Sequence, residues 1–182
     1  IIGVALVFDF TNGFHDSANS ISTVVSTKVL SPRNAVAFAA FFNFIAAFIV
    51  GVAVANTISK IIQLEIVPTD VIPFIILAAL TGAITWNLIT WRFGLPTSSS
   101  HALIGGLMGA GLSAAGLAAI KWSAIELIVT FMVVSPLIGL ACGFLFMVVV
   151  LNLTKNTNKS LADGYFRKLQ LVSAAAYSFS HG

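Results

Sequence analysis

Charged residues are scarce in this sequence. Its 182 residues include 9 Lys or Arg and 6 Asp or Glu, so 8% are charged, whereas about 25% is usual for a soluble globular domain. So few charges cannot cover a water-facing surface, which excludes an ordinary soluble domain. The formal net charge of +3 does not indicate nucleic-acid binding, because the basic residues lie between apolar stretches and are better explained as topology signals.

Four long stretches contain no Asp, Glu, Lys or Arg at all. They are residues 34–59, 71–91, 93–120 and 127–154. Each is long enough to cross a bilayer as a helix, which takes about 20 apolar residues. Buried helices of soluble proteins do not come as four consecutive uncharged runs. The pattern therefore predicts an all-α polytopic membrane protein.

Cysteine is nearly absent, and the ends of the chain lack the features of a natural start. The single cysteine, Cys142, lies in an apolar run, which excludes a disulfide framework and predicts a small buried residue. The sequence opens on Ile1 without Met or a basic segment, so we do not expect the first residues to be a signal peptide. An apolar stretch at 169–179 comes just before the last residue. We expect the sequence to be a piece of a longer chain.

The apolar and polar segments predict one transmembrane repeat over residues 1–153, followed by a basic loop and the truncated start of a second repeat. The repeat would contain a broken helix at 1–27, a helix at 35–59, a hairpin or two paired spans at 71–120, and a helix at 127–153. The loop would be cytoplasmic and span 154–168, and the second repeat would start at 169–182. Abundant Gly, Ala and Ser in the spans suit close helix packing in lipid.

Loop charges predict the orientation of the repeat. Lys28 and Arg33 give the first loop +2, and the 154–168 loop carries +3; both should be cytoplasmic, because Lys and Arg are retained inside. The loops at 60–70 and 121–126 should then lie outside, so the number of crossings is odd and a following repeat would be inverted. Phe10 and Phe179 match at the same spacing as Gly13 and Gly182. Inverted repeats that hold substrate near the midplane recur in transporters.

The first polar segment, residues 9–23, contains Asp9, His15 and Asp16. An ionisable group at membrane depth costs about 2.5–3.5 kcal/mol on insertion scales, so these groups should face a cavity, an ion or a partner. Asn12 and Gly13 predict a helix break, whose free N–H groups favour an anion, while carboxylate and amide oxygens favour a hard cation. The alternative is a surface loop capped by an aspartate. We interpret Asp9 as a structural or gating residue.

The second polar segment places four hydroxyl side chains, Thr97, Ser98, Ser99 and Ser100, between Pro96 and His101. They precede a predicted helix, so side-chain donors and N-terminal N–H groups would meet at one point. Such a cradle suits a tetrahedral oxyanion. The alternative is a capped loop between two spans. Nearby Arg92 is interpreted as a membrane-boundary residue rather than an anion ligand.

Both segments resemble signatures of the PiT inorganic phosphate transporters, in particular the bacterial low-affinity permeases. Residues 12–19 read N-G-F-H-D-S-A-N and residues 95–102 read L-P-T-S-S-S-H-A, and the resemblance extends through 54–58 and 85–87. It implies two inverted repeats, each with a broken first helix and a re-entrant hairpin tipped by hydroxyl residues. This chain would be the first repeat.

The resemblance also implies site roles. Asp16 and Asn19 would bind phosphate and the coupling cation, Ser98, Ser99 and Ser100 would donate to phosphate, and Thr97 is a weaker candidate. Two departures stand out. His15, a coupling-ion candidate, replaces an Asn of many members and resembles permeases that use protons and carry metal–phosphate, while Asn43 replaces a Glu in the second helix.

The predicted function is secondary active symport of inorganic phosphate, or metal–phosphate, with H⁺ or Na⁺ as coupling ion, in the plasma or inner membrane. Expected partners are the bilayer and a second repeat of the same polypeptide, with homodimerisation left open and nucleic acid excluded. No cofactor, resident metal or catalytic residue is expected. Alternatives are a sulfate transporter of the same fold and an ion channel. An enzyme is disfavoured, because Ser98 and His101 lack a nucleophile elbow and an orienting acid.

Overall fold

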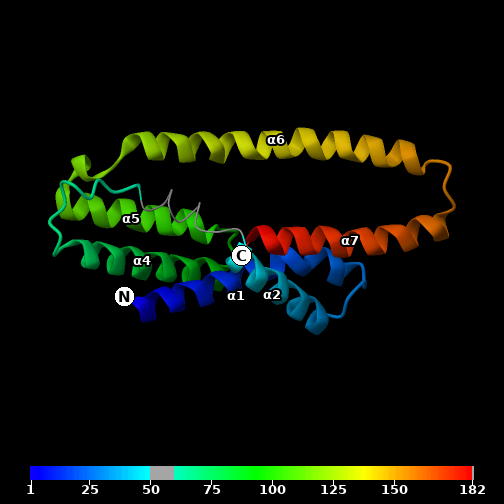
Figure 1. The fold of residues 1–182 in the computed structure, drawn as a ribbon, viewed down its shortest axis with the longest axis horizontal. Coiled ribbons are helices and arrows are strands. Elements are labelled where there is room, and N and C mark those ends of the chain that lie inside the picture. Colours follow the sequence, from blue (N-terminus) through cyan, green and yellow to red (C-terminus); the bar gives the residue numbers. More distant parts are fainter. Residues whose placement is uncertain (50–59, 182) are drawn as a thin grey trace. The chain divides into compact units, whose positions relative to one another are not determined.

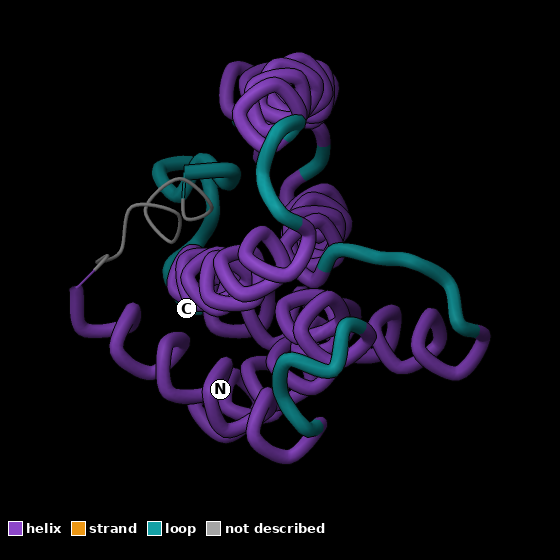
Figure 2. The backbone as a smooth tube through the Cα atoms, turned by 90° about the vertical axis from the view of Figure 1, so that its right-hand side faces the viewer, coloured by secondary structure: helices purple, strands orange, loops and turns teal. Residues whose placement is uncertain are grey.

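A computed structural model describes residues 1–49 and 60–181, and within these residues every regular element is a helix. Figure 2 shows helices joined by loops, without strands in the described part of the chain. The elements are α1 (Ile2–Ser26), α2 (Pro32–Ile49), α4 (Ile72–Phe93), α5 (Ser99–Ala115), η1 (Leu117–Ala119), α6 (Trp122–Thr154) and α7 (Lys159–His181) (Figure 1). The all-α prediction is confirmed.

Three of the described helices, α2, α4 and α6, are long and apolar enough to cross a membrane. The clearest is α6, whose 33 residues give a length of about 50 Å. None of its residues is buried, and Cys142 on this helix is exposed, contrary to the prediction of a buried cysteine. A predominantly apolar helix without buried residues requires an apolar solvent or a further partner, as expected of a membrane protein.

The described residues form two compact units. The first contains residues 1–18 and 60–126, and the second contains residues 19–49 and 127–181. In the second unit α2 and α7 pack together around Val24, Ala35 and Ala174. The Thr27 hydroxyl donates to Gln170 Oε1 at 2.8 Å, which adds a polar contact to the same packing.

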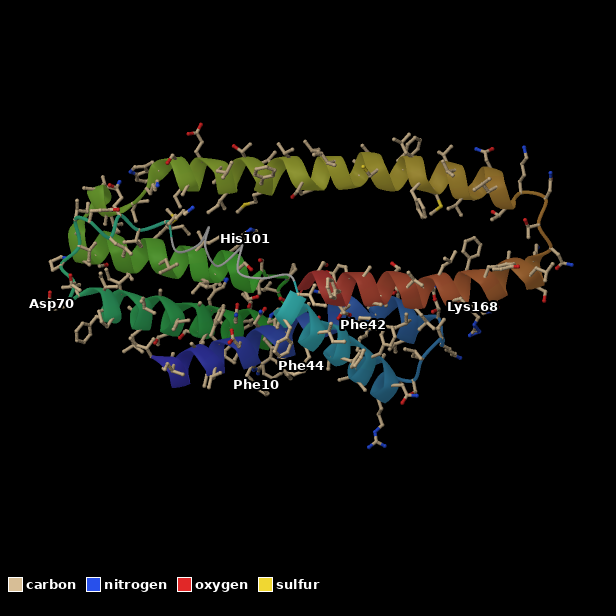
Figure 3. The ribbon with its side chains drawn as sticks, viewed as in Figure 1. Phe10, Phe42, Phe44, Asp70, His101 and Lys168 are labelled. Atoms are coloured by element: carbon tan, nitrogen blue, oxygen red, sulfur yellow. The ribbon has the colours of Figure 1, made fainter. Side chains whose placement is uncertain are left out.

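The first unit is built on a hairpin of α4 and α5, which lie side by side (Figure 1). Gly94 ends α4 in the left-handed region (φ 64°), with its N–H bonded to the Thr90 and Trp91 carbonyls. This Gly-terminated end, followed by Pro96, reverses the chain before α5 begins. In Figure 3, Asp70 before α4 and His101 near the start of α5 mark opposite ends of the hairpin.

A close helix contact holds the hairpin together at Gly106. A Cβ atom added to Gly106 would lie 2.5 Å from the Ala79 carbonyl oxygen. The two backbones therefore approach to a distance that only glycine permits. At the far end, Lys121 N–H donates to the Ile61 carbonyl and Gln63 N–H to the Ala119 carbonyl, both at 2.8 Å, which ties the two loops of the unit together.

The predicted break in the first helix is wrong. The α1 helix runs without interruption from Ile2 to Ser26, across Asn12 and Gly13. A single glycine costs only about 1 kcal/mol within a helix. The Asn12 side chain is engaged by Ser99 rather than by its own backbone, which removes the local competition that makes asparagine a helix breaker.

Two predicted boundaries also differ from the structure. The basic segment 154–168 is not one loop, because α7 begins at Lys159, where Asn158 Oδ1 accepts from Ser160 N–H at 3.0 Å as a cap. The last predicted span begins earlier, at Trp122, because a helix start tolerates the Glu126 charge. Of the helix predicted at 35–59, residues 50–59 lie outside the described part, together with the 54–58 motif.

Candidate functional site

A polar cluster joins α1 to the start of α5 within the first unit. The Ser99 hydroxyl contacts two acceptors on α1, Asn12 Oδ1 and Asp16 Oδ2, the latter at 3.2 Å. Ser99 is 4% exposed. Asn12 and Asp16 are four residues apart, so an unbroken helix places both side chains on one face. The cluster therefore depends on the continuity of α1, which places Asn12 and Asp16 on the side that contacts Ser99.

The Ser99 cluster has more oxygens than protons. A serine hydroxyl carries one proton, so it can satisfy either Asn12 Oδ1 or Asp16 Oδ2, but not both. Three oxygen atoms therefore lie together: Ser99 Oγ, Asn12 Oδ1 and the carboxylate oxygen Asp16 Oδ2. The hydroxyl proton of Ser99 can be donated to only one of the other two. Such an oxygen-rich site suits a hard cation, and it lies beside a helix N-terminus that suits an anion.

His15 lies next to this cluster. Its Nδ1 is 3.8 Å from Asp16 Oδ1, and both side chains are 15% exposed. The other ring nitrogen, Nε2, is buried and has no hydrogen-bond partner among the described residues. A buried ring nitrogen without a partner is uncommon, and Nε2 is therefore available to hydrogen-bond a ligand or water.

The other hydroxyl residues play distinct roles at the start of α5. Ser98 is the N-cap: its backbone is extended, and its Oγ accepts from His101 N–H at 3.4 Å. The capped-loop alternative therefore holds for Ser98. Thr97 and Ser98, with His101 and Trp86, line a cavity of 360 Å³ between α4 and α5. Ser100 is exposed.

Not every predicted residue joins the cluster. Asn19 is exposed and belongs to the second unit, and Asp9 is exposed on α1. Asn43, also in the second unit, has a buried side-chain oxygen without a partner in the described chain. Among the described residues, no group of three or more His, Cys, Asp or Glu could hold a metal ion.

Sequence reasoning missed two polar residues of the first unit. The sequence predicts Asn12 to be a helix breaker, although its spacing from Asp16 indicates a shared helix face. Asn87 on α4 is 2% exposed, and neither its Oδ1 nor its Nδ2 has a partner among the described residues. The available signal was a lone amide in the uncharged stretch 71–91. Close by, Phe14 packs edge-on against Trp91, with ring centroids 5.3 Å apart.

Comparison with known proteins gives consistent matches. A family model described as "Phosphate transporter family" matches residues 12–164. The chain is 51% identical over its full length to a probable low-affinity inorganic phosphate transporter of Rhizobium meliloti, of which it covers 54%, and 44% identical to one of Bacillus subtilis, again covering 54%. The chain thus spans about half the length of these curated relatives.

A solved structure shares the fold. The structure titled "The sodium-dependent phosphate transporter" superposes with a TM-score of 0.80 at 28% sequence identity. The match covers 97% of this chain and 51% of that protein. The chain is therefore similar in fold to about half of a transporter.

Proposed function

Because the chain belongs to the phosphate transporter family, we propose that it forms half of a secondary active symporter that moves inorganic phosphate with a coupling cation. The observation that carries this proposal is the contact between the buried Ser99 hydroxyl and the Asp16 carboxylate. In a chain with 8% charged residues, this contact joins the hydroxyl-rich start of α5 to a carboxylate of α1 within the first unit. An anion and a cation could bind there side by side.

Phosphate would bind at the start of α5. The first N–H groups of a helix lack intrahelical partners, and at α5 they belong to a run of serines. Ser98, Ser99 and Ser100 supply hydroxyl or backbone donors, with Thr97 as a further donor that lines the adjoining cavity. Donors aimed at one point, together with the helix dipole, favour a tetrahedral oxyanion.

The coupling cation would bind at Asp16. A carboxylate beside the phosphate site repels the anion unless a cation neutralises it, so each ligand favours binding of the other. This mutual dependence is what symport requires. Na⁺ would use the cluster oxygens, whereas H⁺ would use Asp16 and His15, which are near each other. Asn19 is proposed as a further ligand from the same helix.

The rest of the machinery would come from a second, inverted repeat of the same polypeptide, in keeping with the coverage of about half of the relatives. We place the protein in the plasma or inner membrane, with phosphate near the midplane and alternating access between the repeats. No covalent step is needed, so no catalytic residue is assigned.

Proteoliposomes with the complete natural protein test this proposal. Na⁺ and pH gradients are imposed independently while uptake of radiolabelled phosphate is followed. We expect accumulation against the phosphate gradient that stops when an ionophore dissipates the driving cation gradient. Phosphate that only equilibrates, with or without the ionophore, would indicate a channel and refute symport.

The cargo needs its own test, because sulfate is a tetrahedral dianion that could use the same donors. Excess sulfate is added to the phosphate uptake assay. We expect little competition by sulfate and full competition by unlabelled phosphate. If sulfate competed as well as unlabelled phosphate, the protein would have to be reassigned as a transporter that also accepts sulfate. Repeating the assay with a chelator of divalent cations distinguishes free phosphate from metal–phosphate, since only the latter loses uptake.

A further inference from the structure

Asn87 is the most deeply buried polar side chain of the first unit for which the structure provides no partner. It is 2% exposed, and both its amide oxygen and its amide nitrogen are unpaired among the described residues. A buried polar group without a hydrogen bond costs about 1–3 kcal/mol. Native proteins pair such groups, and the exceptions are explained by water, an ion or a functional role.

Contacts between α1 and α4 place Asn87 at the level of Asn12. Phe8 of α1 packs with Leu80 and Ala83 of α4, and further along, Phe14 packs with Trp91. The two helices therefore run in the same direction, and the residue of α4 level with Asn12 is Asn87 or its neighbour. This register follows from contacts on both sides of Asn12.

Contacts between α4 and α5 place Asn87 at the level of Ser99. Gly106 lies against Ala79, and Ala102 and Leu103 pack on the cluster that contains Ala83. The helices are antiparallel, so moving along α4 from Ala83 to Asn87 corresponds to moving along α5 from Leu103 to Ser99. The alignment of α4 with α1 and its alignment with α5 therefore both place Asn87 at the level of the Ser99 cluster.

The Asn87 side chain also lies on the face of α4 that contacts α1 and α5. Ala79, Leu80 and Ala83, which contact α1 and α5, are buried together with Asn87 and Thr90, and their spacing defines one helical face. The opposite face carries Thr81 and Thr85, which are exposed and bond to carbonyls of their own helix. Asn87 therefore points into the junction of three helices, α1, α4 and α5.

We propose that Asn87 is a ligand-binding residue of this junction, where its Oδ1 completes a site for a monovalent hard cation with Asn12, Asp16 and Ser99. The cluster offers one oxygen atom each from Asn12, Ser99 and Asn87, and the carboxylate of Asp16, which carries its one negative charge. This composition suits a cation of single charge rather than an anion, since the carboxylate repels anions, and hard cations take oxygen ligands. The inference rests on the proposed function, because it names the ion bound beside phosphate.

Direct binding of Na⁺ tests the role of Asn87. Radiolabelled Na⁺ is titrated onto the complete natural protein in detergent, with choline chloride keeping the ionic strength constant. We expect Asn87→Leu, which has similar volume but no oxygen, to raise the Na⁺ Kd by at least about tenfold, as for the loss of one ligand contact. Asn87→Asp keeps an oxygen ligand and should retain binding.

Thr85→Val is the matched control, because Thr85 lies on the exposed face of the same helix and should leave the Na⁺ Kd unchanged. An unchanged Na⁺ Kd in Asn87→Leu, or no Na⁺ binding by the natural protein, would overturn the inference. Should Asn87→Leu not insert, Asn87→Gln displaces the amide oxygen by one methylene and should also weaken binding. Wild-type affinity in Asn87→Gln would then count against the inference.

Phosphate uptake separates this inference from the proposed function. Na⁺ binding that depends on Asn87, in a protein that does not accumulate phosphate, would support the cation site and refute symport. Uphill phosphate uptake together with Na⁺ binding that ignores Asn87 would leave symport standing and remove Asn87 from the site.

Discussion

Ser99 of α5 and Asp16 of α1 are in contact, with Ser99 Oγ 3.2 Å from Asp16 Oδ2 across 83 residues of sequence. The contact depends on two local features. Gly94 ends α4 so that α5 returns alongside it, and α1 stays helical through Gly13. A buried hydroxyl and a carboxylate therefore lie in contact within one unit of the described chain, at the centre of the site proposed above.

Asp16→Asn should abolish cation-coupled phosphate uptake while leaving the protein inserted in the membrane. The substitution removes the single negative charge of the cluster but keeps an acceptor oxygen near Ser99, so packing should survive. The measurement is radiolabelled phosphate uptake in proteoliposomes, with protein content and orientation checked by labelling.

The matched control for Asp16→Asn is Asp9→Asn. Asp9 lies on the same helix but is exposed, and no described ion pair involves it, so its charge should matter much less. Normal uptake by Asp16→Asn would remove Asp16 from the site. Equal losses in both variants would mean that the charge of α1, rather than the Ser99 cluster, matters.

Gly106→Ala should destabilise the protein, because the new Cβ would lie 2.5 Å from the Ala79 carbonyl oxygen. The Ala79 carbonyl oxygen is a backbone atom and cannot move away by a change of side-chain rotamer. The two helices must therefore separate, which costs about 1–3 kcal/mol for overpacking. The measurement is Tm in detergent. Gly109→Ala is the control, since nothing lies within 4 Å of its added Cβ, and its Tm should not fall. Equal Tm values for both variants would contradict the close contact.

Gly94→Ala should weaken the turn that presents the serines. Gly94 has φ 64°, and an L-residue in the left-handed region costs about 1–2 kcal/mol. We expect a lower Tm and, because Ser99 depends on this turn for its position, a raised KM for phosphate. Gly82→Ala serves as control: Gly82 lies within α4 and has open space at its Cβ position. A Gly94→Ala protein with unchanged Tm and KM would show that α5 is positioned independently of the turn.

Composition and motif are sufficient to predict the helical membrane class and two residues of the Ser99 cluster, Asp16 and Ser99. Uncharged stretches report directly on membrane insertion, and polar residues retained among them are costly, so Asp16 and Ser99 stand out without a structure. Their contact could not be derived from the residues alone. It depends on the register of α1 against α5, which is set by apolar contacts such as Phe8 with Leu80.

Two wrong predictions share a cause, which is that packing overrides a local preference. Asn12 and Gly13 favour a break locally, yet α1 continues because Asn12 finds its partner on another helix. The charges at 154–168 suggested a loop, yet α7 forms because Leu171 and Ala174 pack on Val24 and Ala35. The resemblance includes residues 85–87 but assigns no role to Asn87, and its burial without a partner among the described residues is what points to one.

Ser99→Ala should impair phosphate transport more than Ser100→Ala. Ser99 is 4% exposed and contacts both Asn12 and Asp16, whereas Ser100 is exposed and contributes a peripheral hydroxyl. Loss of a hydrogen bond to a charged group is worth about 1.5–3 kcal/mol, which corresponds to roughly a tenfold or greater rise in KM for Ser99→Ala. Ser100→Ala should change KM by much less.

The serine comparison also separates binding from helix capping. Ser98 is the N-cap of α5, so Ser98→Ala should lower Tm by removing a cap worth about 1 kcal/mol, with a smaller effect on KM than Ser99→Ala. KM from initial uptake rates and Tm in detergent are measured for all three variants. If Ser99→Ala changed only Tm, or if all three variants changed KM equally, the serines would serve as a structural cap and the phosphate site would have to lie elsewhere.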